Sequence, residues 1–334
     1  MVIFDLNIII YCIMDKLKSK KILVTGGAGF IGSNIVEYLL DNNCSYVRVV
    51  DNLSTGNMKN IKFLMDKCKN MEFIEGDIRD IEICREVTKN IDVICHQAAI
   101  GSVPRSVNDP LFSHQNNVDG AFNILLAAKE NKVKRVVYAS SSSVYGDNQD
   151  LPKVENFIGK QLSPYAITKY VNELYARIFT DCYEMECIGL RYFNVFGPRQ
   201  DPNGAYAAVI PKFVSDLINK RAPIINGDGS FSRDFTYVDN VVQANVLAMS
   251  TENKNAFGNV FNIANGGRTT ILDLFVSIKK SLNSNLEPEF TSIRKGDIPH
   301  SNACIQKAKD ILGYKPKISF DNGIKKTIAY YKEN

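Results

Sequence analysis

The sequence predicts an α/β protein with a doubly wound parallel sheet, helices on both faces of that sheet, and a smaller C-terminal unit. From Lys21 onwards, short runs rich in β-branched residues alternate with longer segments whose apolar residues recur at helical spacing. Such alternation is typical of a parallel sheet whose crossover helices pack on its two faces. The chain has 334 residues, of which 45% are hydrophobic, enough for one large α/β unit and a smaller one.

Six short runs of mainly β-branched or apolar residues are the predicted strands. They are Ile22–Val24, Val47–Val50, Met71–Ile74, Ile91–Cys95, Arg135–Tyr138 and Cys187–Leu190. Three segments are longer than buried strands and carry apolar residues at helical spacing, which predicts helices. They are Ile31–Leu40, Val118–Glu130 and Tyr165–Phe179.

The alternation ends after Arg191, where loops rich in Gly, Pro, Asn and Asp begin. Loops of that composition line binding sites more often than they fill cores. We therefore expect a first domain over residues 18–190, to which a later segment of about 234–264 returns, and a discontinuous second domain over 191–334. The second unit is expected to arise from insertions and the C-terminal tail, because no repeat or low-complexity linker is present.

The charge pattern favours a small-molecule partner. Forty Lys and Arg residues stand against 36 Asp and Glu, and the densest basic group is the short run Lys18-Ser19-Lys20-Lys21. A nucleic-acid footprint or a membrane-binding stripe needs a larger cluster, so neither partner is expected. The apolar stretch 1–14 contains Asp5 and is shorter than the roughly 18 apolar residues of a membrane span. A native start at Met14 is a hypothesis.

The eight cysteines are scattered, with no Cys-x-x-Cys pair and no Cys/His cluster at metal-ligand spacing. Several lie in apolar runs such as Val93-Ile94-Cys95. Spacing is the signal that predicts a disulfide framework or a metal site. We therefore expect reduced packing residues, no metal, and a cytoplasmic protein.

A glycine-rich turn, Gly26-Gly27-Ala28-Gly29-Phe30-Ile31-Gly32, directly follows the first predicted strand and opens the first predicted helix. Glycine allows a tight turn and a close approach of backbone N–H groups to a pyrophosphate, and the helix N-terminus favours negative charge. A purely structural turn is the alternative for an isolated glycine triplet. The strand–turn–helix context instead favours a dinucleotide-binding (Rossmann) site. Its predicted contacts are Gly26, Gly29, Phe30, Ile31 and Gly32.

Asp51 follows the second predicted strand, about 20 residues past the turn, where a carboxylate accepts hydrogen bonds from ribose hydroxyls. The same carboxylate repels a 2′-phosphate, so NAD is expected rather than NADP. The alternative is that Asp51 only caps the turn Asp51-Asn52-Leu53-Ser54. We predict NAD as the cofactor, with Asp51 and Asn52 among its contacts.

Tyr165 and Lys169 are four residues apart on a predicted helix, so the phenol and the ammonium lie on one face. A neighbouring cation stabilises phenolate, which makes Tyr165 a candidate acid/base although free tyrosine has a pKa of about 10. Such a pair is common by chance. Its weight comes from Ser141, in the run Ser140-Ser141-Ser142-Ser143 at the end of the fifth predicted strand, because strand ends of such a sheet face the cofactor crevice. A polar loop is the alternative interpretation of that run.

Together these features resemble the extended short-chain dehydrogenase/reductase family, over nearly the whole chain from Lys21. Further matching motifs are Asp51-Asn52-Leu53-Ser54-Thr55-Gly56, Gly76-Asp77-Ile78, His96-Gln97-Ala98-Ala99 and Val144-Tyr145-Gly146. Residues 191–199, 227–229 and 233–235 resemble the members that act on nucleotide-diphosphate sugars. Residues 101–106 and 200–206 more closely resemble bacterial UDP-N-acetylglucosamine 4-epimerases of surface-polysaccharide pathways.

The resemblance implies a role for each matching position. Tyr165 would be the acid/base, Lys169 would bind the nicotinamide ribose and lower the pKa of Tyr165, and Ser141 would bind the sugar 4-hydroxyl. The further NAD contacts that it implies are Asp77, Ile78, Gln97, Ala98, Ala99 and Tyr192. The UDP-sugar contacts that it implies are Ser102, Ser142, Ser143, Asn194, Asn226, Arg233, Arg294, Asp297 and Ser301. An arginine suits this role because its guanidinium forks onto diphosphate oxygens, although a single arginine is also a common surface charge.

The implied reaction is the C4 epimerisation of UDP-N-acetylhexosamines, UDP-GlcNAc to UDP-GalNAc, for surface-polysaccharide synthesis. Tyr165 takes the 4-hydroxyl proton while C4 gives a hydride to NAD, and the 4-keto sugar takes the hydride back on its other face. In related epimerases a tyrosine at the position of Ser301 excludes the 2-N-acetyl group, so serine predicts acetylated substrates. A homodimer is also implied, with Val118–Glu130 and Tyr165–Phe179 as the candidate interface.

Three other functions are alternatives. A 4,6-dehydratase of the same family typically carries Asp-Glu where this chain has Ser142 and Ser143, so the chain lacks proton carriers for elimination. A UDP-glucuronate decarboxylase needs a cationic pocket for the sugar carboxylate, which the sequence neither requires nor excludes. A catalytically silent NAD-binding scaffold is possible on any such fold. Intact Ser141, Tyr165 and Lys169 argue against it.

Overall fold

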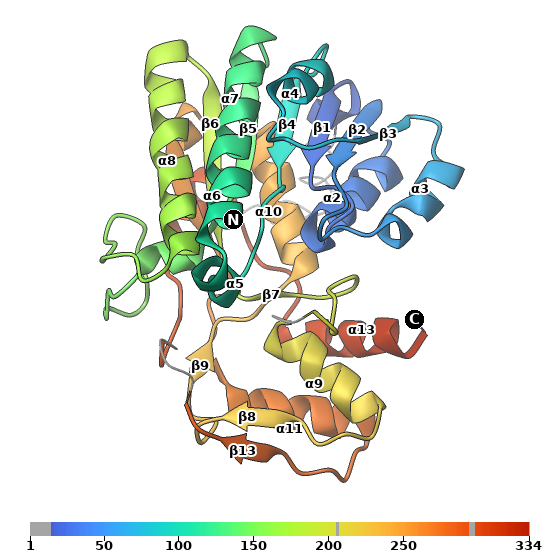
Figure 1. Ribbon diagram of the computed structural model, residues 1–334, viewed down its shortest axis with the longest axis vertical. Coiled ribbons are helices and arrows are strands. Elements are labelled where there is room, and N and C mark those ends of the chain that lie inside the picture. The colour runs from blue at the N-terminus through green and yellow to red at the C-terminus, as the bar shows by residue number, and fades with distance from the viewer. Residues whose placement is uncertain (1–14, 205–206, 294–297, 334) are drawn as a thin grey trace, which may run out of the picture.

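The computed structural model describes residues 15–204, 207–293 and 298–333. Its main feature is a seven-stranded parallel sheet in the order β11-β6-β5-β4-β1-β2-β3 (Figure 1). The strands are β1 (Lys21–Thr25), β2 (Tyr46–Asp51), β3 (Met71–Glu75), β4 (Val93–His96), β5 (Arg135–Ser141), β6 (Glu186–Tyr192) and β11 (Asn259–Ile263). The strand order reverses between β1 and β4, the switch point where such sheets bind ligands. The predicted fold class is confirmed.

All six predicted strands are present, and β11 adds a seventh at the edge of the sheet, paired with β6. Strand β11 was not predicted because it lies within the loop-rich half of the chain, although it falls inside the segment of about 234–264 that was expected to return to the first domain. The helix before it, α10 (Val238–Ser250), packs against the sheet as well. The domain division at residue 190 stays a prediction.

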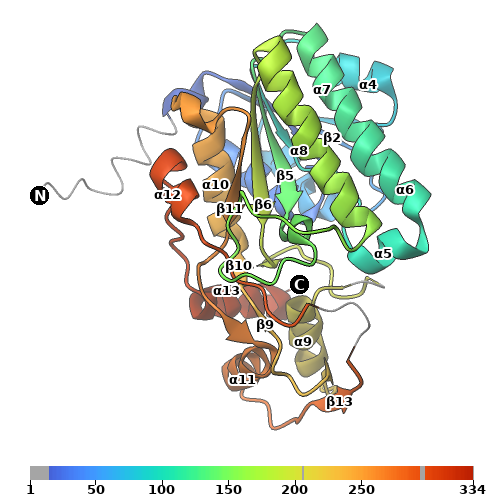
Figure 2. The same cartoon turned by 90° about the vertical axis from the view of Figure 1, so that its left-hand side faces the viewer.

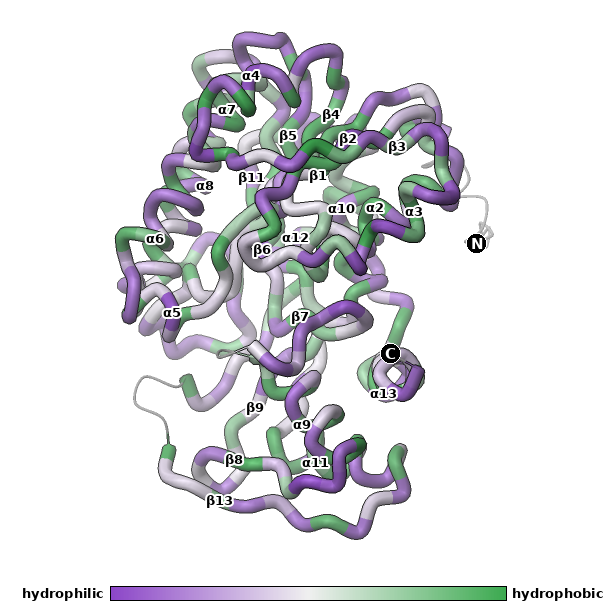
Figure 3. The backbone as a smooth tube through the Cα atoms, turned by 45° about the vertical axis from the view of Figure 1, so that its right-hand side comes forward, coloured by the Kyte–Doolittle hydropathy of each residue, from purple (hydrophilic) through white to green (hydrophobic). Residues whose placement is uncertain are grey.

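Helices cover both faces of the sheet (Figure 2). One face carries α4 (Ile81–Val87), α7 (Gly120–Glu130) and α8 (Pro164–Tyr183), and the other carries α2 (Phe30–Asp41) and α10. Successive strand side chains point to opposite faces, so Leu23 joins the core beneath α7 while Val24 joins the core beneath α2. The central strands β1, β2 and β4 accordingly consist largely of hydrophobic residues (Figure 3).

The predicted helices over 31–40 and 165–179 correspond to α2 and α8. The helix predicted over 118–130 begins earlier, because α6 (Pro110–His114) continues through a π-helical turn (Gln115–Asp119) into α7. Two short helices complete this part of the chain, α3 (Lys62–Lys67) and α5 (Val103–Asn108).

The smaller unit lies beyond the carboxyl ends of the strands (Figure 1). Its strand pairs are β7 (Val195–Phe196) with β10 (Thr236–Tyr237), β9 (Ser232–Arg233) with β12 (Thr269–Thr270), and β8 (Ile224–Asn226) with β13 (Glu289–Thr291). Its helices are α9 (Val209–Ile218), α11 (Ile271–Leu282) and α13 (Phe320–Glu333), while α12 (Gln306–Leu312) packs back against α10 and β11.

Cysteines in the described ranges are free, and Cys44, Cys84, Cys95 and Cys187 are buried in the core. Burial raises the pKa of Cys95 and Cys187 to about 12. Within the same ranges, no three metal-binding side chains gather in one place, and no helix is long and apolar enough to cross a membrane. The stretch 1–14, including the proposed start at Met14, lies outside the described residues.

Candidate active site

The glycine turn between β1 and α2 allows no side chain at two of its positions. Gly26 has φ +67°, and a Cβ there would lie 2.7 Å from Ala98 Cα. A Cβ on Gly32 would lie 2.1 Å from the Gly26 carbonyl oxygen. Helix α2 then begins at Phe30, and its N-cap Gly29 provides no side-chain cap. The first-turn N–H groups are therefore free of side-chain caps and suited to an anion such as a pyrophosphate.

A cleft of about 1040 Å³ runs along the carboxyl ends of the strands. Most of the predicted NAD contacts line it together. They are Gly26, Gly29, Phe30, Ile31, Gly32, Asp51, Asn52, Ile78, Gln97, Ala98, Ala99, Tyr165, Lys169 and Tyr192. A dinucleotide fits this cleft, because the lining extends from the glycine turn to Tyr165 and Lys169. One predicted sugar contact, Ser102, lines the same cleft.

Asp51 lies on the cleft wall and also holds the surrounding turns. Its carboxylate accepts hydrogen bonds from the backbone N–H of Ala28 at 3.0 Å and of Leu53 at 2.9 Å. Burial raises its pKa, and these N–H groups oppose that shift. Asp51 therefore caps its turn, as the alternative interpretation held. A carboxylate has about four acceptor positions, so capacity remains for ribose hydroxyls.

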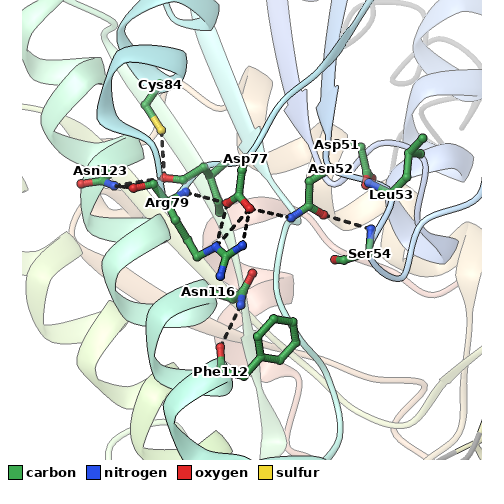
Figure 4. Close-up of polar contacts among 11 residues, drawn as sticks. Asp51, Asn52, Leu53, Ser54, Asp77, Arg79, Cys84, Phe112, Asn116 and Asn123 are labelled. Atoms are coloured by element: carbon green, nitrogen blue, oxygen red, sulfur yellow. Dashed lines mark hydrogen bonds and ion pairs between the residues drawn. The ribbon is translucent and has the colours of Figure 1, made fainter.

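Asp77 is not among the residues that line the cleft; its carboxylate faces Arg79 and Asn52 instead (Figure 4). Arg79 Nη2 donates to it at 2.6 Å and Asn52 Nδ2 at 3.0 Å. The Arg79 guanidinium lowers the pKa of Asp77 to about 2. Asp77 thus joins the loops that follow β2 and β3, and the next residue, Ile78, lines the cleft.

The start of α8 places Tyr165 at the end of β5. Ser163 caps the helix by accepting from the Ala166 N–H at 3.2 Å, and Pro164 occupies the first turn. Tyr165 forms a side-chain hydrogen bond with Ser141. Lys169 Nζ donates to the Ala139 carbonyl oxygen at 2.9 Å and lies 5.9 Å from the centre of the Tyr165 ring. Tyr165, Lys169 and Ser141 are therefore brought together.

Burial is the main cause of the pKa shifts of Tyr165 and Lys169. It raises the pKa of Tyr165, and the hydrogen bond with Ser141 opposes that shift. Burial also lowers the pKa of Lys169 to about 8, so most of the ammonium is still charged at pH 7. The buried His96 interacts electrostatically with the Lys169 ammonium. Burial and Lys169 together lower the pKa of His96 to about 3, so it is neutral at physiological pH.

Tyr192 is fixed by a buried amide network. Its hydroxyl lies 3.0 Å from Gln97 Oε1 and 2.8 Å from Asn245 Nδ2. Gln97 Nε2 in turn donates to Asn245 Oδ1 at 3.1 Å. Asn245 comes from α10, and the sequence offered no signal for it.

Several predicted sugar contacts are not among the residues that line the cleft. They are Ser141, Ser142, Ser143, Asn194, Asn226, Arg233 and Ser301. Ser142 and Ser143 form a 3₁₀ turn capped by Ser141, and Asn194 Nδ2 donates to the Asp234 carbonyl at 3.3 Å.

The other members of this group lie in the smaller unit. Arg233 donates to the backbone of Ser232 and Pro299, and the Ser301 N–H donates to the Ser232 carbonyl at 3.0 Å. Asn226 Oδ1 accepts from Thr291 Oγ1 at 3.1 Å. Arg294 and Asp297 lie outside the described residues.

The cleft has walls that the prediction missed. They include Ser54, Thr55, Gly56, Asn57, Asn60, Arg105, Ser140, residues 199–204, Tyr330 and Tyr331. Ser54, Thr55 and Gly56 belong to the motif that begins at Asp51. Their position next to the predicted ribose contact could have predicted that they line the cleft. Tyr330 and Tyr331 carry no such signal, because they lie at the far end of the chain.

Comparisons with known proteins identify the family of this chain. Residues 22–264 match the NAD dependent epimerase/dehydratase family. A UDP-glucose 4-epimerase of Mycolicibacterium smegmatis is 36% identical over 312 residues, covering 93% of this chain and 98% of the relative.

Two solved structures are similar throughout. The UDP-N-acetylglucosamine 4-epimerase of Methanobrevibacter ruminantium M1, in complex with UDP-N-acetylmuramic acid, is 40% identical with a TM-score of 0.89, covering 94% of this chain and 99% of that one. The UDP-glucose 4-epimerase of Thermotoga maritima with UDP-glucose is 38% identical with a TM-score of 0.88, covering the same shares. The chain thus belongs to the NAD-dependent epimerase/dehydratase family of the extended short-chain dehydrogenases/reductases, as an NAD-dependent enzyme acting on nucleotide-diphosphate sugars.

Proposed function

We propose that this protein epimerises UDP-N-acetylhexosamines at C4, interconverting UDP-GlcNAc and UDP-GalNAc. The observation that carries the proposal is that Tyr165 and Lys169 line the cleft and that Tyr165 is hydrogen-bonded to Ser141, with serine at 142 and 143. This group can move one proton to and from a sugar hydroxyl. It lacks, at positions 142 and 143, the carboxylates that elimination of water would need.

Each of the three residues has its own role in the proposed reaction. Ser141 and the Tyr165 hydroxyl form a hydrogen-bonded pair that can hold a sugar 4-hydroxyl. Tyr165 takes the proton in one half of the cycle and returns it in the other, so it must exist in both protonation states. The Lys169 ammonium, held in place by the Ala139 carbonyl, favours the phenolate state.

The cleft would hold the cofactor that completes the reaction. NAD bound there would supply a reversible hydride acceptor for C4 of the sugar, so the net redox change over a cycle would be zero. Gly26 and Gly32 admit its pyrophosphate, and Asp51 and Ile78 would flank the adenosine. The buried Tyr192–Gln97–Asn245 network keeps the wall at the ends of β4 and β6 rigid.

The preference for acetylated sugars rests on a small side chain. The Ser301 backbone is tied to Ser232, next to Arg233, a proposed diphosphate contact. A serine at this position leaves space for a 2-acetamido group that a tyrosine would fill.

The protein is proposed to act as a homodimer. Helix α8 exposes Ile167, Leu174 and Ile178, each about half accessible and spaced by seven and four residues, so they form one apolar stripe. A second copy that lays its own α8 against this stripe would cover both, because a two-fold interface pairs the same surface on each subunit.

The test is an assay of purified protein without added NAD, using UDP-GlcNAc, UDP-GalNAc, UDP-glucose, UDP-galactose and the UDP-uronic acids in parallel. Interconversion of the acetylated pair is expected. Tyr165→Phe should retain bound NAD while losing most of the activity, because only one hydroxyl is removed. No turnover of any UDP-hexose by the wild type would favour the silent scaffold. Near-normal kcat in Tyr165→Phe would assign the acid/base role to another residue.

A further inference from the structure

The segment 197–204 forms a wall of the cleft. Its residues 199–204 line the same cleft as the glycine turn, and so do Tyr330 and Tyr331 at the end of α13. This segment follows β7 and precedes α9 along the chain, two elements of the smaller unit, whereas the glycine turn belongs to the sheet. Contacts that hold the segment therefore hold one wall of the cleft in place.

Arg199 ties the segment to α2, the helix that begins at the glycine turn. Its Nη2 donates to Asn34 Oδ1 at 2.7 Å and to Glu37 Oε2 at 2.5 Å. The Arg199 side chain is only 8% exposed, so the ion pair with Glu37 is screened less than a surface pair. Asn34 Nδ2 also donates to the Pro198 carbonyl at 3.3 Å.

Tyr331 ties the neighbouring residue to α13. Its hydroxyl donates to the backbone carbonyl of Gln200. Two consecutive residues of the segment are thus held from two elements, α2 in the sheet layers and α13 in the smaller unit. We call these contacts, Arg199 with Asn34 and Glu37 and Gln200 with Tyr331, the clamp.

The clamped residues include an unfavourable backbone conformation and unpaired buried atoms. Arg199 has φ +68°, in the left-handed region that non-glycine residues rarely adopt. Within the described ranges, Arg199 Nε and Gln200 Oε1 are buried without a hydrogen-bond partner. Strain and unpaired buried atoms destabilise a fold, and they persist mainly where the arrangement serves function.

We propose that Arg199, Glu37 and Tyr331 are positioning residues that hold segment 197–204 against bound NAD and slow its release. An epimerisation regenerates NAD in each turnover, so slow release costs no activity, whereas a dehydrogenase must exchange its cofactor. The clamp contacts α2, whose N-terminus would face the pyrophosphate of bound NAD. The inference rests on the NAD site and not on which sugar is converted.

The experiment measures release directly. Wild type, Arg199→Met, Glu37→Gln and Tyr331→Phe are loaded with radiolabelled NAD, desalted and chased with unlabelled NAD, and the retained label is followed over time. Arg199→Met should release NAD at least tenfold faster than wild type. Tyr331→Phe should be at least threefold faster, and it removes a single hydroxyl, so its folding is not in question. Glu37→Gln keeps a neutral acceptor for Arg199 and should fall between wild type and Arg199→Met.

Lys326→Met is the matched control, because Lys326 lies on α13 but pairs with Asp239 at 3.3 Å and does not line the cleft. Its release rate should equal that of the wild type. Added NAD should restore activity lost by the clamp variants after dilution. Release within threefold of the wild type in both Arg199→Met and Tyr331→Phe would overturn the clamp. A wild type that converts no UDP-sugar would refute the proposed reaction but leave the release rates fully interpretable.

Discussion

Glu173 of α8 and Arg191 of β6 form a buried two-point ion pair. Arg191 Nε lies 2.8 Å from Glu173 Oε1, and Nη2 lies 2.7 Å from Oε2. The Glu173 side chain is 6% exposed and the Arg191 side chain is 3% exposed. Ser140 Oγ also donates to Glu173 Oε1 at 2.5 Å. The pair therefore joins β5, β6 and α8 directly behind the candidate catalytic group.

This pair extends a row of contacts between the end of β5 and one face of α8. Three consecutive strand residues, Ala139, Ser140 and Ser141, contact Lys169, Glu173 and Tyr165 respectively. The three helix residues are four apart, so they lie on one face. The row fixes the distance between the strand end and the helix.

Glu173→Gln should lower the free energy of unfolding by about 3–5 kcal/mol, because it leaves the Arg191 charge buried without an anionic partner. Urea unfolding at pH 7 measures this. The control is Asp181→Asn, which breaks the exposed Arg177–Asp181 pair on the same helix and should change stability little. Equal effects of the two substitutions would contradict a special role for the buried pair.

Lys169→Met should reduce kcat at pH 7 at least tenfold and shift the rising limb of the pH profile to higher pH. The reason is that phenolate formation at Tyr165 loses its nearest cation, which raises the pKa of the phenol. The measurement is kcat from pH 6 to pH 10 with saturating NAD. Lys129→Met, which removes a lysine 4.1 Å from the Tyr183 ring and away from the cleft, should leave the profile unchanged. An unshifted profile in Lys169→Met would exclude this electrostatic role.

Ser301→Tyr should reverse the substrate preference, lowering kcat/KM for UDP-GlcNAc relative to UDP-glucose by tenfold or more. A phenol ring at this position would occupy the space proposed for the 2-acetamido group. Parallel kcat/KM measurements on both sugars test this, with Ser301→Ala as the small control. Equal kcat/KM for acetylated and plain sugars in the wild type would refute the proposed selectivity.

The buried His96 should make the protein less stable in acid. Its pKa is about 3 in the fold and about 6.5 in an unfolded chain, so the unfolded state takes up a proton first as the pH falls. This group alone should remove about 2 kcal/mol of stability between pH 7 and pH 5. Urea unfolding at both pH values measures it. His96→Asn should lose that component, whereas the exposed His114→Asn should keep it.

Ile178→Arg should convert the expected dimer into a monomer, because it places a charge in the apolar stripe on α8. Sedimentation velocity measures the change. Phe290→Arg, at an exposed position on β13, is the control and should leave the assembly unchanged. A wild-type monomer, or a dimer that persists in Ile178→Arg, would rule out this interface.

The sequence by itself determined the features that depend on neighbours along the chain. The strand runs, the glycine turn at Gly26 and the helix that carries Tyr165 and Lys169 were all predicted. Their signals are local, because residue spacing alone sets which side chains share a strand face or a helix face. NAD followed from the same reasoning, since the turn and Asp51 belong to one β–α–β unit.

Only the tertiary structure decided which distant residues meet at the cleft. Asn245 reaches Tyr192 from α10, Arg199 reaches Glu37 across two units, and Tyr331 comes from the last helix. No spacing rule connects residues that are 53 to 162 positions apart. Their contacts depend on how packed layers and loops are arranged, and the energies of many weak contacts, rather than a local pattern, set that arrangement.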